Sequence, residues 1–475
     1  MAVRLSPEEA RRAMRASTLE GAFASASDNA AAPFLPLYGL SLGATSAHIG
    51  LLAALPNLLT NGLQVPWAVL TERLGRRNQV MLWGAVGSRV LWLPLVLLPW
   101  LGLGSLAVPA LLVAVGLRAA VAGMVGPAWT SLMADLVPRR LRGMYFANRN
   151  IVANVSALSA IVLAGILVEA GGDPGGYQLV FGFAVLTGLI AGAYMRQMPD
   201  LPWEGRPTTA AQGRGSRRTW FGWLEDRNFN RYCSASFLWA LAVNLPAPLF
   251  AVYYVTHLGG TPAGWGLVTA ANVAATVLGQ RYWGLLSQRF GEKQVMLVSG
   301  AGACLLPLLW LAAPSALWAL AVNGLGGFVW AGYNLANFNL LLSLAPAVRR
   351  TTFVAIYNTI IGLGAALGPL IGGYLADLAG IPVVLLISGV SRFFALWVFS
   401  RRVEQRTRPM TAADFLPLWV KMWRQTGTRA VLARVRLSLR RPRPRRRQLD
   451  RLAPSPRRSL PNETSRDRPN GNDDQ

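Results

Sequence analysis

Long apolar runs alternate with short polar turns along most of this chain, and this pattern predicts helices that cross a membrane. A membrane-spanning helix needs about 20 mostly apolar residues. Between residues 18 and 400, runs of this kind predict twelve spans, at 18–41, 47–70, 79–101, 106–132, 145–168, 178–198, 230–256, 264–286, 295–312, 316–343, 353–377 and 381–400. We therefore expect an all-α integral membrane protein.

The polar turns between the runs fall into two alternating groups. One group carries basic residues, among them Arg73, Arg289 and Lys293, whereas the intervening turns contain no lysine or arginine. Basic loops stay on the cytoplasmic side of a membrane. We expect a multi-pass protein of the cytoplasmic membrane with both termini in the cytoplasm. Residues 1–17 lack the apolar region and cleavage site of a signal peptide, so we expect none to be removed.

The charge of the chain is concentrated in a few places. Only 14% of the residues are charged, yet the net charge is +25, and much of it lies beyond the last predicted span. Within that tail, residues 411–439 alternate apolar and basic positions, which suits a helix on the inner membrane surface. Contact with anionic lipid and a merely solvated basic tail are both open interpretations. Nucleic-acid binding is disfavoured because the arginines are not interleaved with stacking aromatic residues.

These patterns divide the chain into five segments. We expect a cytoplasmic N-terminal segment at 1–17, a six-helix half at 18–198, a cytoplasmic linker at 199–229, a second six-helix half at 230–402, and a basic cytoplasmic tail at 403–475 that ends in disorder.

An internal repeat relates the two halves. The stretch Gln64–Leu82 returns as Gln280–Leu297, with the letters QVML in both copies. Outside that stretch, Asn29 matches Asn244, Gly50 matches Gly266 and Asn150 matches Asn358, in registers that drift slowly along the chain. Because an even number of spans separates matched helices, the halves have the same topology. They should be related by an axis along the membrane normal, with a solute site between them near mid-depth.

The turn inside the repeat resembles a signature of the major facilitator superfamily. That signature reads G-x-L-x-D-R-x-G-R-R, and residues 68–77 match it except that Ala68 and Glu72 replace its glycine and aspartate. The second copy, residues 284–293, keeps the glycines but loses the acid of the signature. The resemblance implies alternating access and a loop that latches the outward-facing state. A basic turn without a gating role is the alternative. The candidate gate residues are Glu72, Arg73, Gly75, Arg76, Arg77, Asp135, Arg289 and Gly291.

Two ionisable residues stand out at the middle of the predicted spans, Asp28 in the first and Arg118 in the fourth. A charge at this depth costs at least about 2.5 kcal/mol, and a facing pair relieves the cost for both partners. Their matched positions in the second half, Val243 and Gly326, are uncharged. One hypothesis makes Asp28 the protonatable coupling group and Arg118 its partner or an anchor for an anionic solute. A static structural ion pair is the alternative.

Uncharged polar residues within the spans form a second set. Such side chains either join helices to one another or line a wet cavity. The candidates for the substrate cavity are Asn29, Asn57, Asn61, Gln64, Asn244, Asn272, Gln280, Tyr333 and Asn334.

The sequence therefore predicts a secondary active transporter that moves a small organic solute by alternating access, coupled to protons. Uptake and efflux both stay open, with efflux favoured by a narrow margin. A transporter-fold sensor or scaffold that signals through its basic tail is the alternative. We expect a monomer with no cofactor and no metal site. An enzyme is disfavoured because Asp28 has no nucleophile and base around it.

Overall fold

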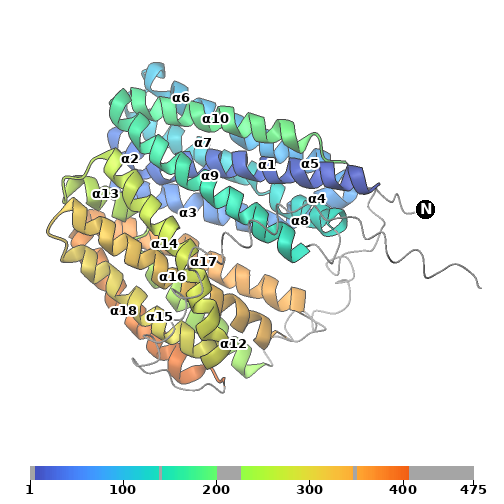
Figure 1. Cartoon of the computed structure of the whole chain (residues 1–475). Helices are drawn as coiled ribbons and strands as arrows, with labels where there is room; N and C mark the ends of the chain where they lie inside the picture. The colour runs from blue at the N-terminus through green and yellow to red at the C-terminus, as the bar shows by residue number, and fades with distance from the viewer. Residues whose placement is uncertain (1–5, 138–141, 200–225, 346–349, 406–475) are drawn as a thin grey trace, which may run out of the picture. The chain divides into compact units, whose positions relative to one another are not determined.

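The computed structural model describes residues 6–137, 142–199, 226–345 and 350–405, which belong to one compact unit. All regular structure in these ranges is helical (Figure 1). The predicted all-α fold is confirmed. The predicted linker and basic tail lie almost wholly outside the described residues, so the surface helix at 411–439 and its lipid contact stay predictions.

The first half contains the helices up to α10. In chain order they are α1 (Pro7–Ala31), η1 (Ala32–Phe34), α2 (Leu35–Ser41), α3 (Ser46–Gly62), α4 (Gln64–Leu74), α5 (Arg77–Val90), α6 (Leu93–Leu97), η2 (Leu98–Leu101), η3 (Gly104–Leu106), α7 (Ala107–Ala122), α8 (Val125–Leu136), α9 (Arg142–Gly171) and α10 (Gly175–Met195).

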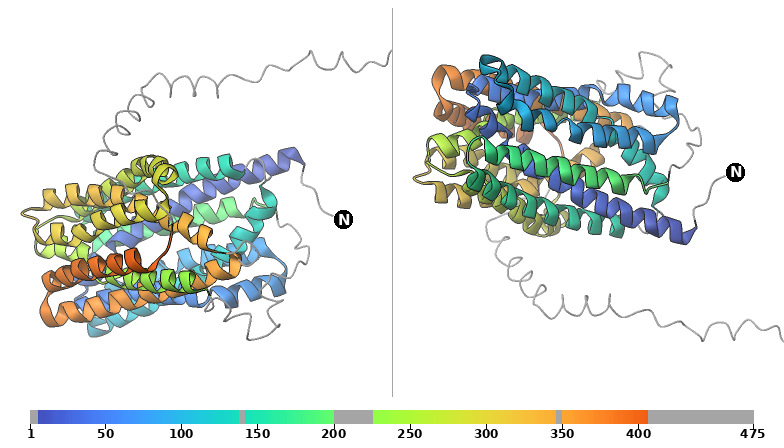
Figure 2. Two further views of the ribbon diagram at one scale, coloured as in Figure 1. Left: turned by 90° about the horizontal axis from the view of Figure 1, so that it is seen from below. Right: turned by 90° about the horizontal axis from the view of Figure 1, so that it is seen from above.

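The second half repeats this plan with fewer interruptions, since α14 and α16 are continuous where the first half has the pairs α3–α4 and α7–α8. They are α12 (Arg227–Asn244), α13 (Leu249–Thr256), α14 (Pro262–Phe290), α15 (Glu292–Leu311), α16 (Ala316–Leu344), α17 (Arg350–Ala379) and α18 (Ile381–Arg402). In the first half α1 packs against α9 and α10, and in the second half α12 packs against α17 and α18 (Figure 2). The pairs α3–α7 and α14–α16 correspond in the same way. The internal repeat is therefore also a repeat of the packing.

The first helix differs from the predicted span at 18–41. It begins at Pro7, where the Ser6 hydroxyl accepts a hydrogen bond from the amide of Glu9 and the Glu9 carboxylate accepts one from the amide of Ser6. This capping box is a strong local start signal. The helix then breaks near Pro33, because proline has no N–H to continue the hydrogen-bond ladder. A short 3-10 turn follows, and α2 starts at Leu35.

Nine helices in the described ranges are long and apolar enough to cross a membrane. The other three predicted spans coincide with α1–α2, α3–α4 and α14, which are helical but fall outside that group. Polar residues such as Asp28, Asn61 and Asn272 lie on these helices and lower their hydropathy. The count of twelve therefore stays a prediction, and the three less apolar segments are those that carry many of the candidate cavity residues.

The two repeated turns share a glycine in a backbone conformation that other residues rarely adopt. Helix α4 ends at Gly75, with φ of 64°, and α14 ends at Gly291, with φ of 86°. Only glycine takes positive φ at low cost. The matched glycines therefore end matched helices and let α5 and α15 reverse direction.

Candidate functional site

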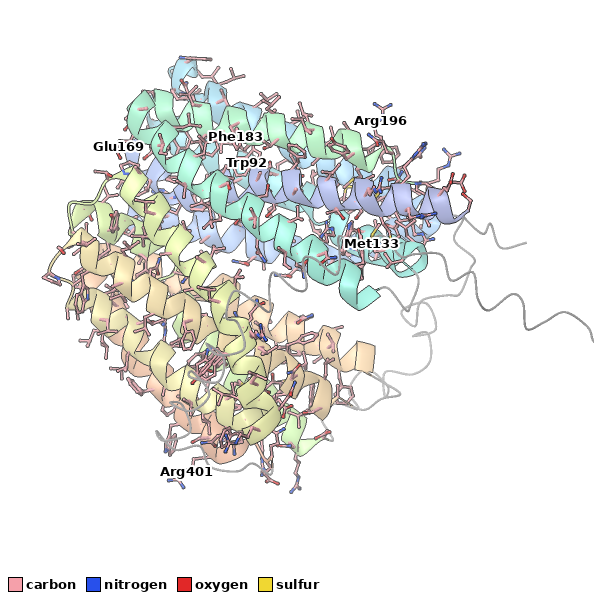
Figure 3. All side chains as sticks on the ribbon, in the orientation of Figure 1. Trp92, Met133, Glu169, Phe183, Arg196 and Arg401 are labelled. Carbon is pink, nitrogen blue, oxygen red and sulfur yellow. The ribbon has the colours of Figure 1, made fainter. Side chains whose placement is uncertain are left out.

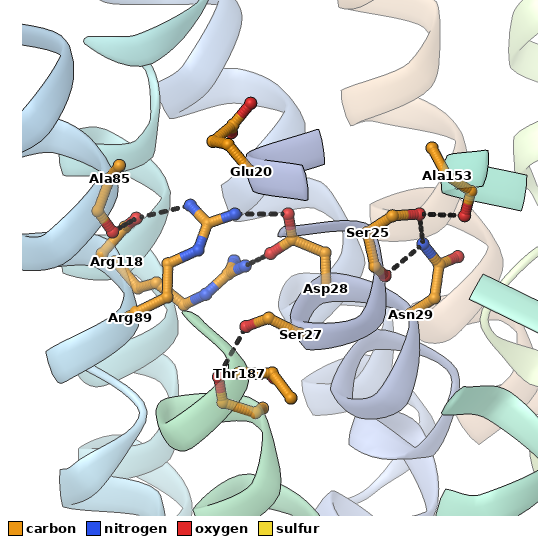
Figure 4. A network of polar contacts seen from close by, with 12 residues as sticks. Glu20, Ser25, Ser27, Asp28, Asn29, Ala85, Arg89, Arg118, Ala153 and Thr187 are labelled. Carbon is orange, nitrogen blue, oxygen red and sulfur yellow. Dashed lines mark hydrogen bonds and ion pairs between the residues drawn. The ribbon is translucent and has the colours of Figure 1, made fainter. Parts of the chain in front are cut away.

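Asp28 lies near the end of α1 and bridges two arginines. Its Oδ1 accepts a hydrogen bond from Arg118 Nη2 at 2.8 Å, and its Oδ2 accepts one from Arg89 Nη2 at 2.8 Å (Figure 4). We call Asp28, Arg89 and Arg118 the charge node. The sequence nominated Asp28 and Arg118, and the structure places them together. The arrangement does not test whether Asp28 couples to protons, so this role stays a prediction.

The surroundings hold both arginines in place. Arg118 projects from α7 and its guanidinium lies 4.0 Å from the ring centre of Trp92, a cation–π contact. Arg89 comes from the last turn of α5, and its Nη1 donates to Ser88 Oγ at 3.0 Å. A Cβ at Gly188 of α10 would overlap the stem of Arg89. Glycine at 188 therefore makes the space through which Arg89 reaches Asp28.

Exposure differs sharply between the acid and the bases. The side chain of Asp28 is 44% exposed, whereas those of Arg89 and Arg118 are 8% and 15% exposed. Two guanidinium groups against one carboxylate leave a formal charge of +1. Charge-assisted hydrogen bonds are strong where water is scarce. The charge node thus presents a half-exposed carboxylate over two largely buried guanidinium groups.

Arg89 was missed by the sequence analysis, although the signal was present. It lies within the predicted span at 79–101, where an arginine is as anomalous as Arg118. The same holds for Arg392, which lies within the span at 381–400. Arg392 is 2% exposed, and it donates from Nη1 to the carbonyl of Ala303 at 2.8 Å and from Nη2 to that of Val243 at 3.2 Å.

A second ion pair lies on α1 closer to its start. Arg149 of α9 donates from Nη2 to Glu20 Oε2 at 3.0 Å and from Nε to the carbonyl of Ser17 at 3.1 Å. Its guanidinium stacks 4.5 Å from the ring centre of Trp129. Glu20 is buried and, like Asp28, is an acid within the first predicted span, which was the available signal. This pair joins α1 to α9.

The polar candidates make three kinds of contact, with another helix, with their own helix and with solvent, and some of them make two kinds. The amides of Asn272 and Asn323 donate to carbonyls across the α14–α16 contact, to Asn323 and Val268 at 3.1 and 3.0 Å. They join helices, as does Asn57, which reaches the carbonyl of Ala365 on α17 at 3.5 Å. Four candidates donate from their amides to carbonyls of their own helix, namely Asn29, Asn57, Asn61 and Asn244. The exposed candidates are Asn61, Gln64, Gln280 and Asn334.

Tyr333 belongs to a buried aromatic cluster. It is 5% exposed and stacks on Trp239 with ring centres 4.6 Å apart. The ring of Trp330 lies edge-on, 5.7 Å from that of Tyr333. In this conformation Tyr333 packs within the second half and does not face solvent.

The candidate gate is described only in part. The backbones of Glu72 and Asp135 lie in α4 and α8, but their side chains fall outside the described structure. Arg73 and Arg76 are exposed, and Arg77 is buried. Arg289 lies 5.1 Å from the ring centre of Phe290. Gly75 and Gly291 form the turns described above. The gating role stays a prediction.

Comparisons with known proteins agree with this architecture. The model of the Major Facilitator Superfamily matches residues 20–244 and 232–441. The multi-drug resistance efflux pump PmrA of Streptococcus pneumoniae is 25% identical over 152 residues, which are 32% of this chain and 38% of PmrA. The multidrug resistance protein MdtG of Dickeya zeae is 30% identical over 157 residues, 32% of this chain and 37% of MdtG. These matches span less than half the length of either relative.

A solved structure extends the likeness to the whole fold. A mutant of the nucleoside transporter NupG superposes with a TM-score of 0.68 and 12% identity, covering 82% of this chain and 100% of that one. At this identity the likeness shows the fold alone. The family model matches most of the chain, in two copies that follow the internal repeat. The chain therefore belongs to the major facilitator superfamily of multi-pass membrane transporters.

Proposed function

We propose that this transporter moves a small organic solute by alternating access and couples that movement to protons at the charge node. The observation that carries the proposal is the half-exposed carboxylate of Asp28 between two largely buried guanidinium groups. The names of PmrA and MdtG support drug-like solutes, and that of PmrA supports efflux.

The chemistry of the charge node favours a solute with an anionic group. A carboxylate or phosphate on the solute would compete with Asp28 for Arg118, because guanidinium groups pair well with such oxyanions. Losing that partner raises the proton affinity of a carboxylate. Asp28 would then take up a proton as the solute binds and give it up as the solute leaves. Solute and proton would thus bind together through one arginine, which an inward proton gradient turns into uptake, whereas the efflux that the name of PmrA supports requires solute and proton to bind in turn.

We propose that both termini face the cytoplasm and that the chain lies in the cytoplasmic membrane as a monomer. The basic turn that follows α4 and the basic start of α1, with Arg11, Arg12 and Arg15, support this orientation. The alternative of a sensor that signals through the basic tail depends on residues outside the described ranges. Family membership favours transport.

Proteoliposomes with an imposed pH gradient test the coupling. A panel of organic anions and amphipathic dyes first identifies solutes that the wild-type protein moves. Asp28→Asn removes the titratable group but keeps its size. We expect this variant to lose gradient-driven flux while still exchanging solute in the absence of a gradient. The control is Glu8→Gln, the same change at the exposed start of α1, which should leave both rates unchanged. Full gradient-driven flux in Asp28→Asn would contradict the proposal.

A further inference from the structure

The two halves meet along two matched helix crossings. Helix α3 packs against α17, and α14 packs against α9. The register of the repeat that matches Gly50 with Gly266 relates α3 to α14, and the register that matches Asn150 with Asn358 relates α9 to α17. Each crossing therefore joins the second predicted span of one half to the fifth predicted span of the other.

At each crossing, an acidic residue of one helix caps the N-terminus of the helix that it crosses. At the first crossing, Asp377 near the end of α17 accepts hydrogen bonds from the amides of Ser46 and Ala47 at 2.8 and 2.9 Å. At the second, Glu169 near the end of α9 accepts one from the amide of Ala263 at 3.3 Å. The first amides of a helix lack partners within the helix and attract negative charge. Both acids therefore bind helix N-termini in the opposite half.

The two acids occupy the same position of the repeat. The register that relates α9 to α17 matches Glu169 with Asp377, and the register that relates α3 to α14 matches Ala47 with Ala263. The difference in bond number also follows from the sequence. Ser46 corresponds to Pro262, which has no N–H to donate. Glu169 thus has one amide fewer to bind than Asp377.

Glycines let the backbones approach beside each acid. A Cβ at Gly50 of α3 would lie 3.1 Å from Gly373 Cα of α17, and one at Gly266 of α14 would lie 3.3 Å from Gly165 Cα of α9. Gly50 corresponds to Gly266, and Gly165 to Gly373, in the same two registers. The crossings are therefore built from the same parts twice, each with a close glycine contact and an acid that caps the partner helix.

We propose that Glu169 and Asp377 are the gate residues that hold the halves together at the end remote from the arginine-bearing turns. Figure 3 shows Glu169 at the opposite end of the first half from Arg196. This inference rests on alternating access, because opening at that end must separate α3 from α17 and α14 from α9. Both acids must then leave their helix N-termini. They are positioning residues that bias the conformational equilibrium and have no contact with the charge node among the hydrogen bonds described above.

Spin-label distances across this end test the gate without any solute. Ser105 lies in η3 of the first half and Ser315 directly before α16 of the second, both are exposed, and cysteine is a conservative replacement for serine. The native Cys233 and Cys304 are buried and should not react. In the full-length protein we expect a dominant short distance between the two labels. In the double variant Asp377→Asn with Glu169→Gln, the ratio of long to short distances should rise roughly tenfold or more.

Matched variants separate a gate from a general structural effect. Asp377→Glu, which copies the acid of the other crossing, should keep the short distance. Ser46→Pro, which copies Pro262, removes the amide and the hydroxyl of residue 46 but keeps the acid and the amide of Ala47, and it should shift the ratio less than Asp377→Asn. Asp173→Asn changes an exposed acid of the same end and should have no effect.

An unchanged distance distribution in the double variant would overturn the gate. A shift in Asp377→Glu as large as that in Asp377→Asn would also overturn it, because the charge of residue 377 would then be irrelevant. Neither result bears on Asp28, because its test measures the flux of solute that a pH gradient drives. Failure of the gate and failure of the proposed coupling are therefore distinguishable.

Discussion

The two halves deliver an arginine to one matched place from different helices. In the first half Arg89 reaches across from α5 over Gly188 of α10 and binds Asp28 of α1. In the second half Arg392 comes from α18, the counterpart of α10, and binds the backbone of α12 and α15 at Val243 and Ala303. Each arginine thus lies where the first, third and sixth predicted spans of its half meet.

The register of the repeat makes this comparison residue by residue. The register that matches Asn29 with Asn244 also matches Asp28 with Val243. A shorter spacing near the ends of the halves matches Ala184 with Ser388, and Gly188 with Arg392. This spacing has structural support, because Ser27 Oγ donates to the carbonyl of Ala184 in the first half and Ser388 Oγ donates to that of Ala242 in the second. The same two positions are bonded, with donor and acceptor exchanged.

The difference shows which part of the charge node is architectural. A buried guanidinium recurs in both halves, so its presence alone does not indicate chemistry. A half-exposed carboxylate beside it occurs in the first half, whereas the matched position in the second half is Val243. Asp28 and the additional arginine Arg118 are therefore the features on which the proposed coupling rests.

Removing an arginine should impair transport in the first half but not in the second, and this is the largest effect we expect. Arg118→Met leaves Asp28 with one partner and removes the anchor for an anionic group. Losing a charge-assisted contact to the solute worth about 3 kcal/mol should lower gradient-driven flux by roughly a hundredfold. Arg392→Met replaces a buried charge, whose bonds described above go to backbone carbonyls, by a side chain of similar volume and should keep most of the flux. Equal loss of flux in both variants would contradict this expected difference.

Filling the space above Gly188 should have an effect of intermediate size. Gly188→Ala places a methyl group where the stem of Arg89 lies, and the overpacking should lower the stability of the protein by about 1–3 kcal/mol. Gly182→Ala on the same helix has open space around it. It should be neutral or slightly stabilising, because alanine favours helix more than glycine does. Thermal unfolding in detergent measures both variants, and equal midpoints would show that Arg89 can be accommodated elsewhere.

The smallest effect should come from giving the second half the carboxylate that it lacks. Val243→Asp places an acid beside Arg392, whose Nη2 already donates to the carbonyl of residue 243. A double-mutant cycle with Arg392→Met isolates the interaction between the two side chains. We expect a favourable coupling free energy of about 1 kcal/mol in thermal unfolding. A coupling near zero would mean that the two halves hold their arginines at different places.

Much of the fold was predictable from the sequence because it depends on local and repeated signals. Apolar runs marked the helices, and the two copies of the QVML stretch revealed the repeat. Asp28 and Arg118 were recognisable as costly charges within apolar spans. Arg89 and Arg392 carry the same signal of a charge within an apolar span, but their partners lie on other helices and are set by tertiary packing.

The proposed gate at Glu169 and Asp377 could not be predicted in the same way. Glu169 and Asp377 look like ordinary polar residues at the ends of spans, and their partners are backbone amides, which leave no mark in the sequence. Their role depends on which helices of opposite halves cross, and the crossing is a tertiary feature. The pairing of Glu20 with Arg149 depends likewise on the contact between α1 and α9, which is a tertiary feature.

The break at Pro33 has a mechanical consequence for the first helix. The outer segment α2 packs against α13 of the other half, and Trp265 of α14 donates from Nε1 to the carbonyl of Pro33 at 2.9 Å. The backbone ladder is already interrupted at this point, so bending there sacrifices fewer hydrogen bonds than bending elsewhere along α1. Pro33 can therefore act as a hinge. The outer segment α2 can follow the second half while Asp28, five residues before Pro33, stays with the first.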